Sequence, residues 1–367
     1  MNGWITGLGT IAALELRQRV RSVAWLVLLI VVFVIVAIVT LLLWFSLSTF
    51  GDDSVDNAAI YSSIVFFVLL VGTLVTPAVS GGAINAERDA GTLATTQVTL
   101  VSAGQIVLGK FLAAWTIALT FLAASLPFIV LAVAIGGVPI TTLLTSLAVL
   151  VVELGVVAAI GVGLSGLQTR ALFSVVTTYL VVAALSIGTL IAFGLGGLAS
   201  QSEVRSVYIG YTYDQSVELD PDTGLPEDPD DITCLEPEVT TYQAPRFDRV
   251  WWFLAANPYI VLADASPTTF DENGNPEDLF GGIGLGIRGA QLPPDLEQTY
   301  DECANAKANW RLVQDDYETP EEVYAKTVPS WFVGIVIHLV LAGLALWGAV
   351  ARTRTPSKHL PKGSRVA

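Results

Sequence analysis

The chain has 367 residues, of which 53% are apolar and only 14% are charged, and its mean hydropathy is +0.64. Soluble globular proteins carry about 25% charged residues, so this composition excludes an ordinary soluble protein. The net charge of -15 argues against a nucleic-acid partner, because a phosphate backbone is bound by clustered Lys and Arg. The composition therefore predicts an integral membrane protein.

Six apolar runs are long enough to cross a bilayer, whose core of about 30 Å needs roughly 20 helical residues. Such continuous runs favour helices over the alternating pattern of a membrane barrel. Between Lys110 and Arg170 the only ionisable side chain is Glu153, and a turn at residues 136–139 divides this tract in two. The predicted spans are residues 25–45, 60–84, 111–135, 140–164, 171–198 and 331–350.

The distribution of charge predicts the orientation, because Lys and Arg near the ends of spans stay on the cytoplasmic side. Arg17, Arg19 and Arg21 precede the first run, which is too long for a signal peptide and is expected to be retained. Residues 199–328 carry 26 acidic and 7 basic side chains. We therefore expect a multi-pass plasma-membrane protein with both termini in the cytoplasm and a large acidic segment outside.

The expected fold class is an all-α polytopic membrane protein with a mixed, acidic extracellular domain between spans five and six. Its parts are an N-terminal interfacial helix (1–24), spans one to five (25–198) with a cytoplasmic loop (85–106), the extracellular domain (199–329), span six (330–351) and a basic tail (352–367). Within the extracellular domain, residues 204–213 predict a strand and residues 294–316 predict a helix.

Both cysteines, Cys234 and Cys303, fall in the segment expected outside the cell, where disulfides persist. We expect them to be bonded to each other, the alternative being two independent buried thiols. Their spacing and the absence of His from this segment argue against a zinc site, and we expect no metal. The run from Asp271 to Asn275 is similar to part of a calcium loop, but Asp, Asn and Gly at a turn explain it more simply.

The loop between the second and third runs contains the most informative residues. Gly104, Gly109 and Lys110 match the spacing of a phosphate-binding loop. Phe111 stands where that motif needs Ser or Thr to bind magnesium, and no strand precedes it. The sequence therefore predicts no nucleotide site in this chain.

The same loop resembles the permease family of type-2 ABC exporters, in which six spans accompany cytoplasmic Glu-Arg, Gly-Thr-Leu and Gly-Lys sequences. The matching residues are Glu87, Arg88, Gly91, Thr92, Leu93, Gly109 and Lys110. The resemblance extends to a short helix before the first span and to Asn257-Pro258. It implies that residues 85–106 dock on a separate ATPase subunit, whereas the insertion before span six is longer than in simple family members.

The resemblance also implies the partners: two ABC ATPase subunits, a second permease copy or a related permease, and membrane lipid. ATP and magnesium would bind the ATPase, and this chain would hold no cofactor and would not itself be an enzyme. An alternative is that residues 85–106 are a solvated connection, although 22 residues exceed what a hairpin needs.

The segment ahead of the first run predicts an interfacial helix. Its apolar face, interrupted by Glu15 and Arg19, consists of Trp4, Ile5, Leu8, Ile11 and Ala12. Such a face suits a helix lying on anionic lipid, and a soluble lead-in helix is the alternative.

Two ionisable groups remain inside the spans. Glu153 lies near the middle of span four, where a charge costs about 3 kcal/mol, so it must face protein or water. It is either part of a substrate path, a proton-sensitive group or a carboxyl that fixes helix packing. His338 is expected nearer the outer surface, which makes a direct pair with Glu153 doubtful.

We expect a permease subunit that exports a lipid-like, amphiphilic or drug-like substrate, because the spans contain few fixed charges. Two other classes remain open: a proton-coupled secondary transporter that uses Glu153, and a membrane-anchored receptor or assembly factor whose extracellular domain binds a protein.

Overall fold

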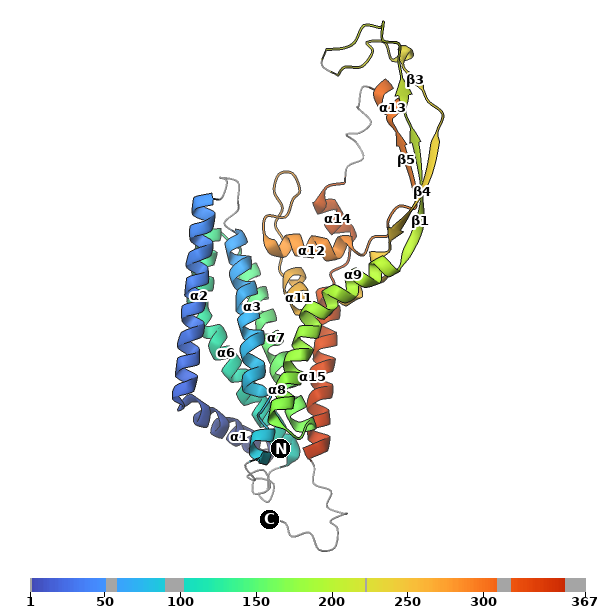
Figure 1. Cartoon of the computed structure of the whole chain (residues 1–367). Coiled ribbons are helices and arrows are strands. Elements are labelled where there is room, and N and C mark those ends of the chain that lie inside the picture. Colours follow the sequence, from blue (N-terminus) through green and yellow to red (C-terminus); the bar gives the residue numbers. More distant parts are fainter. Residues whose placement is uncertain (1, 51–57, 90–101, 222, 309–317, 354–367) are drawn as a thin grey trace.

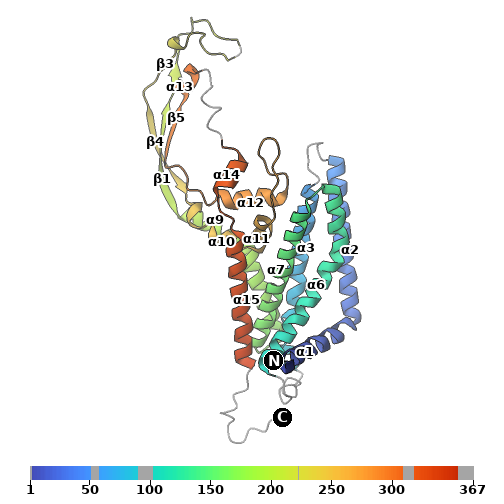
Figure 2. The ribbon, with the colours of Figure 1, turned by 180° about the vertical axis from the view of Figure 1, so that it is seen from behind.

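The computed structural model describes residues 2–50, 58–89, 102–221, 223–308 and 318–353. It is mostly helical, and six helices are long and apolar enough to cross a membrane. These six helices form a bundle, and the segment between the fifth and sixth of them projects from one end (Figure 1, and from behind Figure 2). We call this segment, residues 200–330, the insertion, and the opposite end of the bundle the base. The prediction of six spans is confirmed.

The spanning helices follow the predicted runs and extend them by a few residues. They are α2 (Val23–Phe50), α3 (Ala58–Ser80), α6 (Ala103–Gly136), α7 (Ile140–Leu167), the continuous helix α8 (Ala171–Ala183), η1 (Ala184–Gly188) and α9 (Thr189–Ala199), and α15 (Trp331–Thr353). Helix α7 is central, since 72% of its most apolar window is buried, against 17% in α2.

Small residues let α7 approach its neighbours closely, as expected for helices packing in lipid. A Cβ atom at Gly161 would lie 2.0 Å from Oγ of Ser80, and one at Gly163 would lie 2.5 Å from Cβ of Ala345. Neither position has room for a larger side chain, so these glycines set the distances from α7 to α3 and α15.

Local sequence explains the ends of α6. The Ser102 side chain accepts the Gln105 backbone N–H while the Gln105 side chain accepts the Ser102 backbone N–H, which is a capping box. At the other end, Gly137 has φ of 63°, a left-handed conformation that favours glycine, and Pro139 precedes α7. The predicted turn at 136–139 is confirmed.

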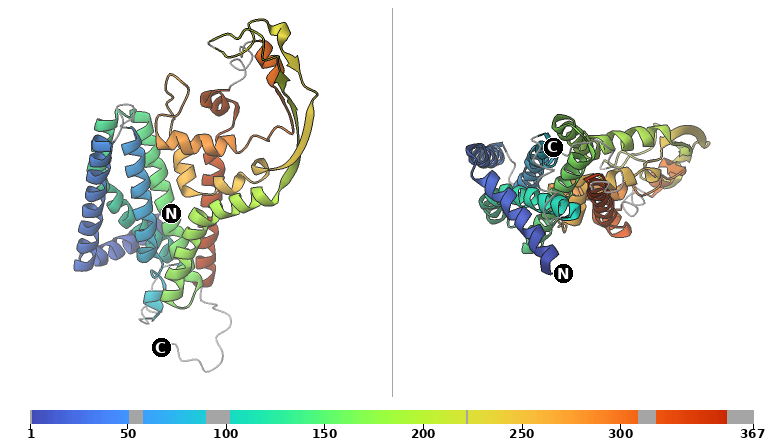
Figure 3. Two further views of the ribbon diagram at one scale, coloured as in Figure 1. Left: turned by 45° about the horizontal axis from the view of Figure 1, so that its top comes forward. Right: turned by 90° about the horizontal axis from the view of Figure 1, so that it is seen from below.

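The fifth span contains a π-helical turn, η1, in its middle. Such a turn disturbs the regular ladder of backbone hydrogen bonds. The Ser186 carbonyl in η1 accepts a 2.6 Å bond from the Asn257 side chain of the insertion. Beyond η1, α9 leans away from the bundle and leads into the insertion (Figure 3, left).

The base carries two helices that do not span. Helix α1 (Asn2–Val20) lies across the lower ends of the spans (Figure 3, right), and α4 (Asn85–Asp89) follows α3. The helix predicted ahead of the first span is therefore present. The last turn of α15 also reaches the base (Figure 1).

The insertion has a compact part, which lies on the end of the bundle opposite the base, and a projecting arm (Figure 1). We call this end of the bundle the mouth. The compact part contains η3 (Phe247–Arg249), α10 (Trp252–Ala255), α11 (Pro258–Ala265), α12 (Leu279–Gly289) and α14 (Pro320–Lys326). The arm contains β1 (Gln201–Ile209), β2 (Tyr211–Thr212), η2 (Pro229–Asp231), β3 (Thr233–Cys234), β4 (Glu238–Pro245), β5 (Glu297–Asp301) and α13 (Glu302–Lys307). The mixed α and β composition that was expected here is present.

The arm sheet has strand order β4-β1-β5, with β1 antiparallel to β4 and parallel to β5. The predicted strand at 204–213 corresponds to β1 and β2. The predicted helix at 294–316 is wrong, because residues 297–301 form β5 and only 302–307 are helical, while 309–316 lie outside the described residues. Pairing with β1 satisfies the backbone of this segment and overrides its local helix preference.

Cys234 and Cys303 are joined, with their Cα atoms 5.4 Å apart, as predicted. The bond connects β3 to α13 across 69 positions of sequence, and Cys303 is fully buried. It closes the outer end of the arm.

Candidate functional site

Lys110, in the first turns of α6, is the centre of a charged cluster at the base. Its side chain is 2% exposed, and its Nζ lies 2.6 Å from Oε1 of Glu87 on α4 and bonds Glu15 of α1. Arg19 of α1 lies 3.8 Å from Glu15 and donates a 2.8 Å bond to the Val79 carbonyl at the end of α3. We call these four side chains, Glu15, Arg19, Glu87 and Lys110, the basal cluster. Two positive and two negative groups make it neutral, which permits a buried lysine.

Gly109 explains how α1 reaches Lys110. A Cβ atom at this position would lie 2.8 Å from Cγ2 of Ile11 and 3.2 Å from the Leu8 carbonyl. One helical turn earlier, Nε2 of Gln105 donates a 2.9 Å bond to the Trp4 carbonyl. The Gly-Lys pair therefore has a physical role in this chain: the glycine admits α1 and the lysine binds it. Because Gly104, Gly109 and Lys110 all lie in α6, the stretch is not a phosphate-binding loop.

The apolar face that predicts an interfacial helix is only partly exposed in α1. Trp4 and Ile5 are 47% and 61% exposed, but Leu8 and Ile11 are half-buried, and the Ile11 side chain and the Leu8 carbonyl lie against Gly109 of α6. Glu15, which interrupts the apolar face, is bonded to Lys110. An interruption of an amphipathic face was thus the sequence signal for a helix that packs on protein.

Arg88, the second residue of the motif, joins α4 to the far side of the bundle. Its Nη1 donates to Oδ1 of Asn85 at 3.1 Å and to the Gln168 carbonyl at the end of α7 at 2.8 Å. The Ser165 hydroxyl of α7 accepts the backbone N–H groups of Ile84 and Asn85. Helix α4 is therefore attached to α1, α6 and α7 together. The other predicted loop residues, Gly91, Thr92 and Leu93, lie outside the described residues.

Glu153 and His338 form the second buried site, and the expectation that they do not pair is wrong. Nδ1 of His338 lies 2.9 Å from Oε1 of Glu153, and the two side chains are 0% and 2% exposed. Glu153 is 13 positions into α7 and His338 only 7 into α15. The error came from counting depth along each helix separately, whereas α15 begins below α12 and α14 (Figure 2). The difference of six positions at which the two residues meet corresponds to about 9 Å at 1.5 Å per residue.

The hydrogen bonds define where the protons of this pair are. Nε2 of His338 lies 2.8 Å from the Ala256 carbonyl, which can only accept, so Nε2 carries a hydrogen. Between Nδ1 and the Glu153 carboxyl there is room for one further proton. The pair is then either imidazolium with carboxylate or imidazole with carboxylic acid, and in both forms its net charge is zero. A neutral pair avoids the cost of an isolated charge in the membrane.

Asn257 and the residues before it attach the insertion to the spans. Asn257 caps α11 by accepting the Tyr259 N–H, and its Nδ2 donates to the Ser186 carbonyl and to Oγ1 of Thr189. Gly334 of α15 touches the same segment, since a Cβ atom there would lie 2.1 Å from the Ala255 carbonyl. Residues 255–257 thus bridge spans five and six, and His338, which bonds the Ala256 carbonyl, connects them to Glu153 of span four.

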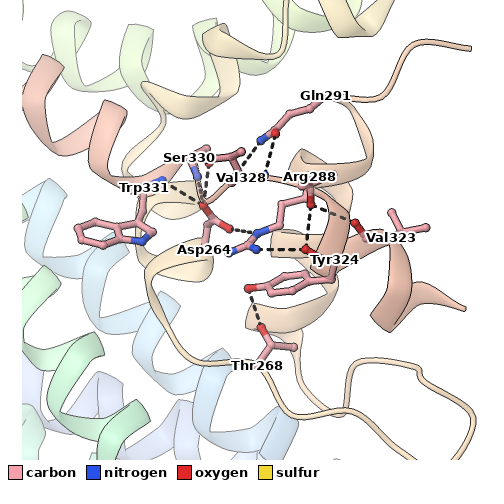
Figure 4. A network of polar contacts seen from close by, with 10 residues as sticks. Asp264, Thr268, Arg288, Gln291, Val323, Tyr324, Val328, Ser330 and Trp331 are labelled. Carbon is pink, nitrogen blue, oxygen red and sulfur yellow. Dashed lines mark hydrogen bonds and ion pairs between the residues drawn. The ribbon is translucent and has the colours of Figure 1, made fainter.

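Asp264 fixes the start of α15 to the insertion (Figure 4). Its buried carboxylate accepts Nε of Arg288 at 2.8 Å, the Ser330 N–H and hydroxyl, and the Trp331 N–H. The Arg288 guanidinium lies 3.6 Å from the centre of the Tyr324 ring. We call this group the Asp264 clasp, and sequence analysis missed it because its members come from α11, α12, α14 and the lead into α15.

An apolar hollow of about 610 Å³ lies between α3, the fifth span and the insertion. Its few polar groups include Thr73, Tyr179 and Asn257. Tyr179 donates a 2.7 Å bond to the Leu74 carbonyl, and the Tyr259 hydroxyl lies 3.4 Å from that of Thr73. We call this the side hollow. Glu153, one of whose candidate roles was in a substrate path, does not line this hollow and is enclosed with His338.

Several carboxyl groups of the insertion have shifted pKa values. Burial raises the pKa of Asp278, although its Gly281 N–H bond at 2.8 Å opposes the shift. Bonds from Arg246 at 2.7 and 2.6 Å lower the pKa of Asp248. In the turn compared above to a calcium loop, Asp271 accepts the backbone N–H groups of Asn273 and Asn275, which also lowers its pKa. This carboxylate is engaged by its own turn.

No group of three or more His, Cys, Asp or Glu side chains suited to a metal ion occurs within the described residues. The fold, with six helices long and apolar enough to cross a membrane among the described residues, is that of a multi-pass membrane protein. No protein-family model matches the chain, and no curated protein matches it either.

Proposed function

We propose that this chain is the permease subunit of an ATP-driven exporter, with the base in the cytoplasm and the insertion outside. The observation that carries the proposal is the attachment of α4. Glu87 bonds Lys110, Arg88 bonds the Gln168 carbonyl, and Ser165 accepts two backbone N–H groups at the start of the helix. A displacement of α4 by a cytoplasmic ATPase would be transmitted to α1, α6 and α7 together.

This geometry gives Glu87 and Arg88 a positioning role in place of a direct contact with the ATPase. Glu87 and Arg88 are held by groups of the same chain, so they position α4 for an ATPase contact made by neighbouring loop residues. The ATPase subunits would bind ATP and magnesium, and two permease chains would complete the transporter.

The side hollow supports an amphiphilic, lipid-like or drug-like substrate. Its volume of about 610 Å³ suits a molecule of that size, and most of its lining is apolar. The Tyr179 hydroxyl donates to the Leu74 carbonyl, so its oxygen can still accept a bond from such a molecule. The hollow lies between two spans, so a substrate dissolved in the bilayer would have a short path to it.

Purification in mild detergent from the native membrane tests the proposal. An ATP-binding chain should be recovered in near-equal amount, and its hydrolysis should respond to amphiphilic compounds. The proposal is wrong if this chain is recovered alone at every detergent and salt condition that leaves its fold intact.

A second candidate, a proton-coupled secondary transporter, is favoured by the buried Glu153 and His338 pair. Both nitrogens of His338 are bonded, and the pair can keep one shared proton without changing its net charge, which suits a fixed structural link better than a site that loads and unloads protons. Transport by this chain alone, driven by a pH gradient in proteoliposomes, would decide in favour of the second candidate. A receptor or assembly role for the insertion would instead leave no transport activity at all.

A further inference from the structure

A second hollow, of about 510 Å³, lies at the base between the α7 to α8 connection and the last turn of α15. Arg170, the residue before α8, and Arg352 both line it, together with Gln168, Thr169 and Phe173. The two arginines are 182 positions apart in sequence and meet here because α7 and α15 pack closely, with Gly348 against Leu167. We call this the arginine hollow.

The charges of the arginine hollow are uncompensated within the part of the chain that the structure describes. Arg170 and Arg352 are both exposed, and no described carboxylate lies within 4.0 Å of either guanidinium. Other basic groups at the base differ: Arg19 and Lys110 belong to the basal cluster, and Arg88 is bonded to Asn85. Two guanidinium groups facing one hollow match the fork geometry with which arginine binds phosphate oxygens.

The surroundings of the hollow are those of a membrane interface. Leu172 and Phe173, two and three residues after Arg170, are 73% and 60% exposed, and Trp347, five residues before Arg352 in the same helix, is 70% exposed. A ligand that fits both features has an anionic head for the arginines and apolar chains for the neighbouring side chains. Hydroxyl and amide groups of Thr169, Thr177 and Gln168 can accept or donate further bonds to the head.

We propose that the arginine hollow binds the phosphate head of an anionic phospholipid in the leaflet at the base. Basic hollows between spans at a membrane surface are suited to such heads. The inference rests on the membrane location of the six spans, and only the naming of the leaflet as cytoplasmic rests on the proposed function. The bound lipid would link the fifth and sixth spans at the level where α4 meets α7.

The test measures lipid retention by the full-length protein, purified with any subunits that accompany it, using native mass spectrometry and exchange in nanodiscs. The probe is phosphatidylglycerol, and phosphatidylcholine serves as the neutral comparison. The variant Arg170→Gln/Arg352→Gln should weaken phosphatidylglycerol retention by about 30-fold, since each charge near the surface contributes roughly fivefold. The variant Arg170→Lys/Arg352→Lys, which keeps the charges, should retain most of it.

The matched control is Arg17→Gln/Arg21→Gln, which removes the same number of exposed positive charges from the base outside the hollow. It should lower the general attraction to anionic bilayers without removing the tightly retained lipid. Equal losses in the two double variants would overturn the proposal, as would equal retention of the two lipids. Displacement of the lipid by millimolar inorganic phosphate would show an ion site and overturn it, and so would loss of an ATPase subunit with lipid retention unchanged. Failure of the exporter proposal would leave the lipid measurement valid.

Discussion

Lys110 Nζ lies 2.6 Å from Oε1 of Glu87, which joins the third span to the short helix that follows the second. The same ammonium group bonds Glu15, so one buried lysine holds α1, α4 and α6 together. Gly109 beside it leaves the space in which α1 lies. Helix α4 is therefore attached to the bundle by specific charges, and each of them can be removed separately.

The variant Lys110→Met should release α1 from the bundle. It keeps the length of the side chain but removes the ammonium group that bonds both Glu15 and Glu87, while Arg19 stays 3.8 Å from Glu15. Because both carboxylates retain some contact with solvent, the change costs about 1–3 kcal/mol. Protease cleavage within residues 2–20 should increase, and recovery of an ATPase subunit should fall.

The control for this change is Arg17→Met, which removes an exposed cation from the same helix. Arg88→Ala should lower ATPase recovery as Lys110→Met does, since it removes the bond from α4 to the Gln168 carbonyl. If the control and these variants behave alike, α4 is only a connection between spans.

The variant Glu153→Gln should change transport less than tenfold. The amide N–H of Gln can donate to Nδ1 of His338 while Nε2 keeps its bond to the Ala256 carbonyl, so the bridge between spans four and six persists. Glu153→Leu cannot form this bond and leaves a buried nitrogen unpaired, at a cost of about 1–3 kcal/mol. Thermal unfolding and transport, measured for both variants, check the prediction. A complete loss of transport in a well-folded Glu153→Gln protein would contradict it and favour a proton site.

The variant Asp264→Ala should detach the start of α15 from the insertion. Arg288 would become a buried cation without its anion, and breaking such a pair costs about 3–5 kcal/mol. Hydrogen exchange should rise in α11, α12 and α14. Lys326→Ala is the control, since its pair with Glu318 is more than half exposed and contributes little. Similar exchange in both variants would exclude a clasp that holds these elements.

The variant Asp278→Asn should stabilise the insertion near neutral pH. Burial raises the pKa of this carboxyl above 3.8, so the folded state binds a proton more readily than the unfolded state does. Stability therefore falls as pH rises through this window, and an uncharged amide that still accepts the Gly281 N–H avoids the loss.

The melting temperature of this variant should exceed that of the parent at neutral pH, with a gain that shrinks as pH falls toward 3.8. Asp271→Asn should give the opposite sign. Its pKa is lowered by backbone N–H bonds, so its contribution is present above 3.8 and is lost at lower pH. A constant difference across pH in both variants would contradict the assignment.

Reduction of the Cys234 and Cys303 bond should loosen the arm and leave the bundle intact. Closing a loop of about 70 residues stabilises the folded state by roughly 4 kcal/mol in the chain-entropy model. The variant Cys303→Ser should make residues 211–234 sensitive to protease, while cleavage within the spans stays unchanged and serves as the internal control. Two free thiols in non-reducing mass spectrometry of the parent would contradict the pairing.

The spans, the turn at Gly137 and the cysteine pair could be predicted because each depends on local sequence or on one simple rule. Twenty apolar residues must be helical in lipid, Gly137 supplies a left-handed turn, and two cysteines of one segment have only each other. The charged residues of the loop motif, Glu87, Arg88 and Lys110, could also be identified from local sequence. The contacts among Glu15, Glu87 and Lys110 could not be predicted, because these residues lie up to 95 positions apart.

Tertiary structure alone decided the pairing of Glu153 with His338, the strand at Glu297–Asp301 and the Asp264 clasp. The pairing depends on the offset between the first turn of α15 and the first turn of α7 along the bundle. Counting residues along either helix alone does not give this offset. The strand exists because β1 offers an unpaired edge, and the clasp because four elements meet at the mouth of the bundle. In each case the stabilising hydrogen bonds and ion pairs join groups that are distant in sequence, so the site forms only when the chain has folded.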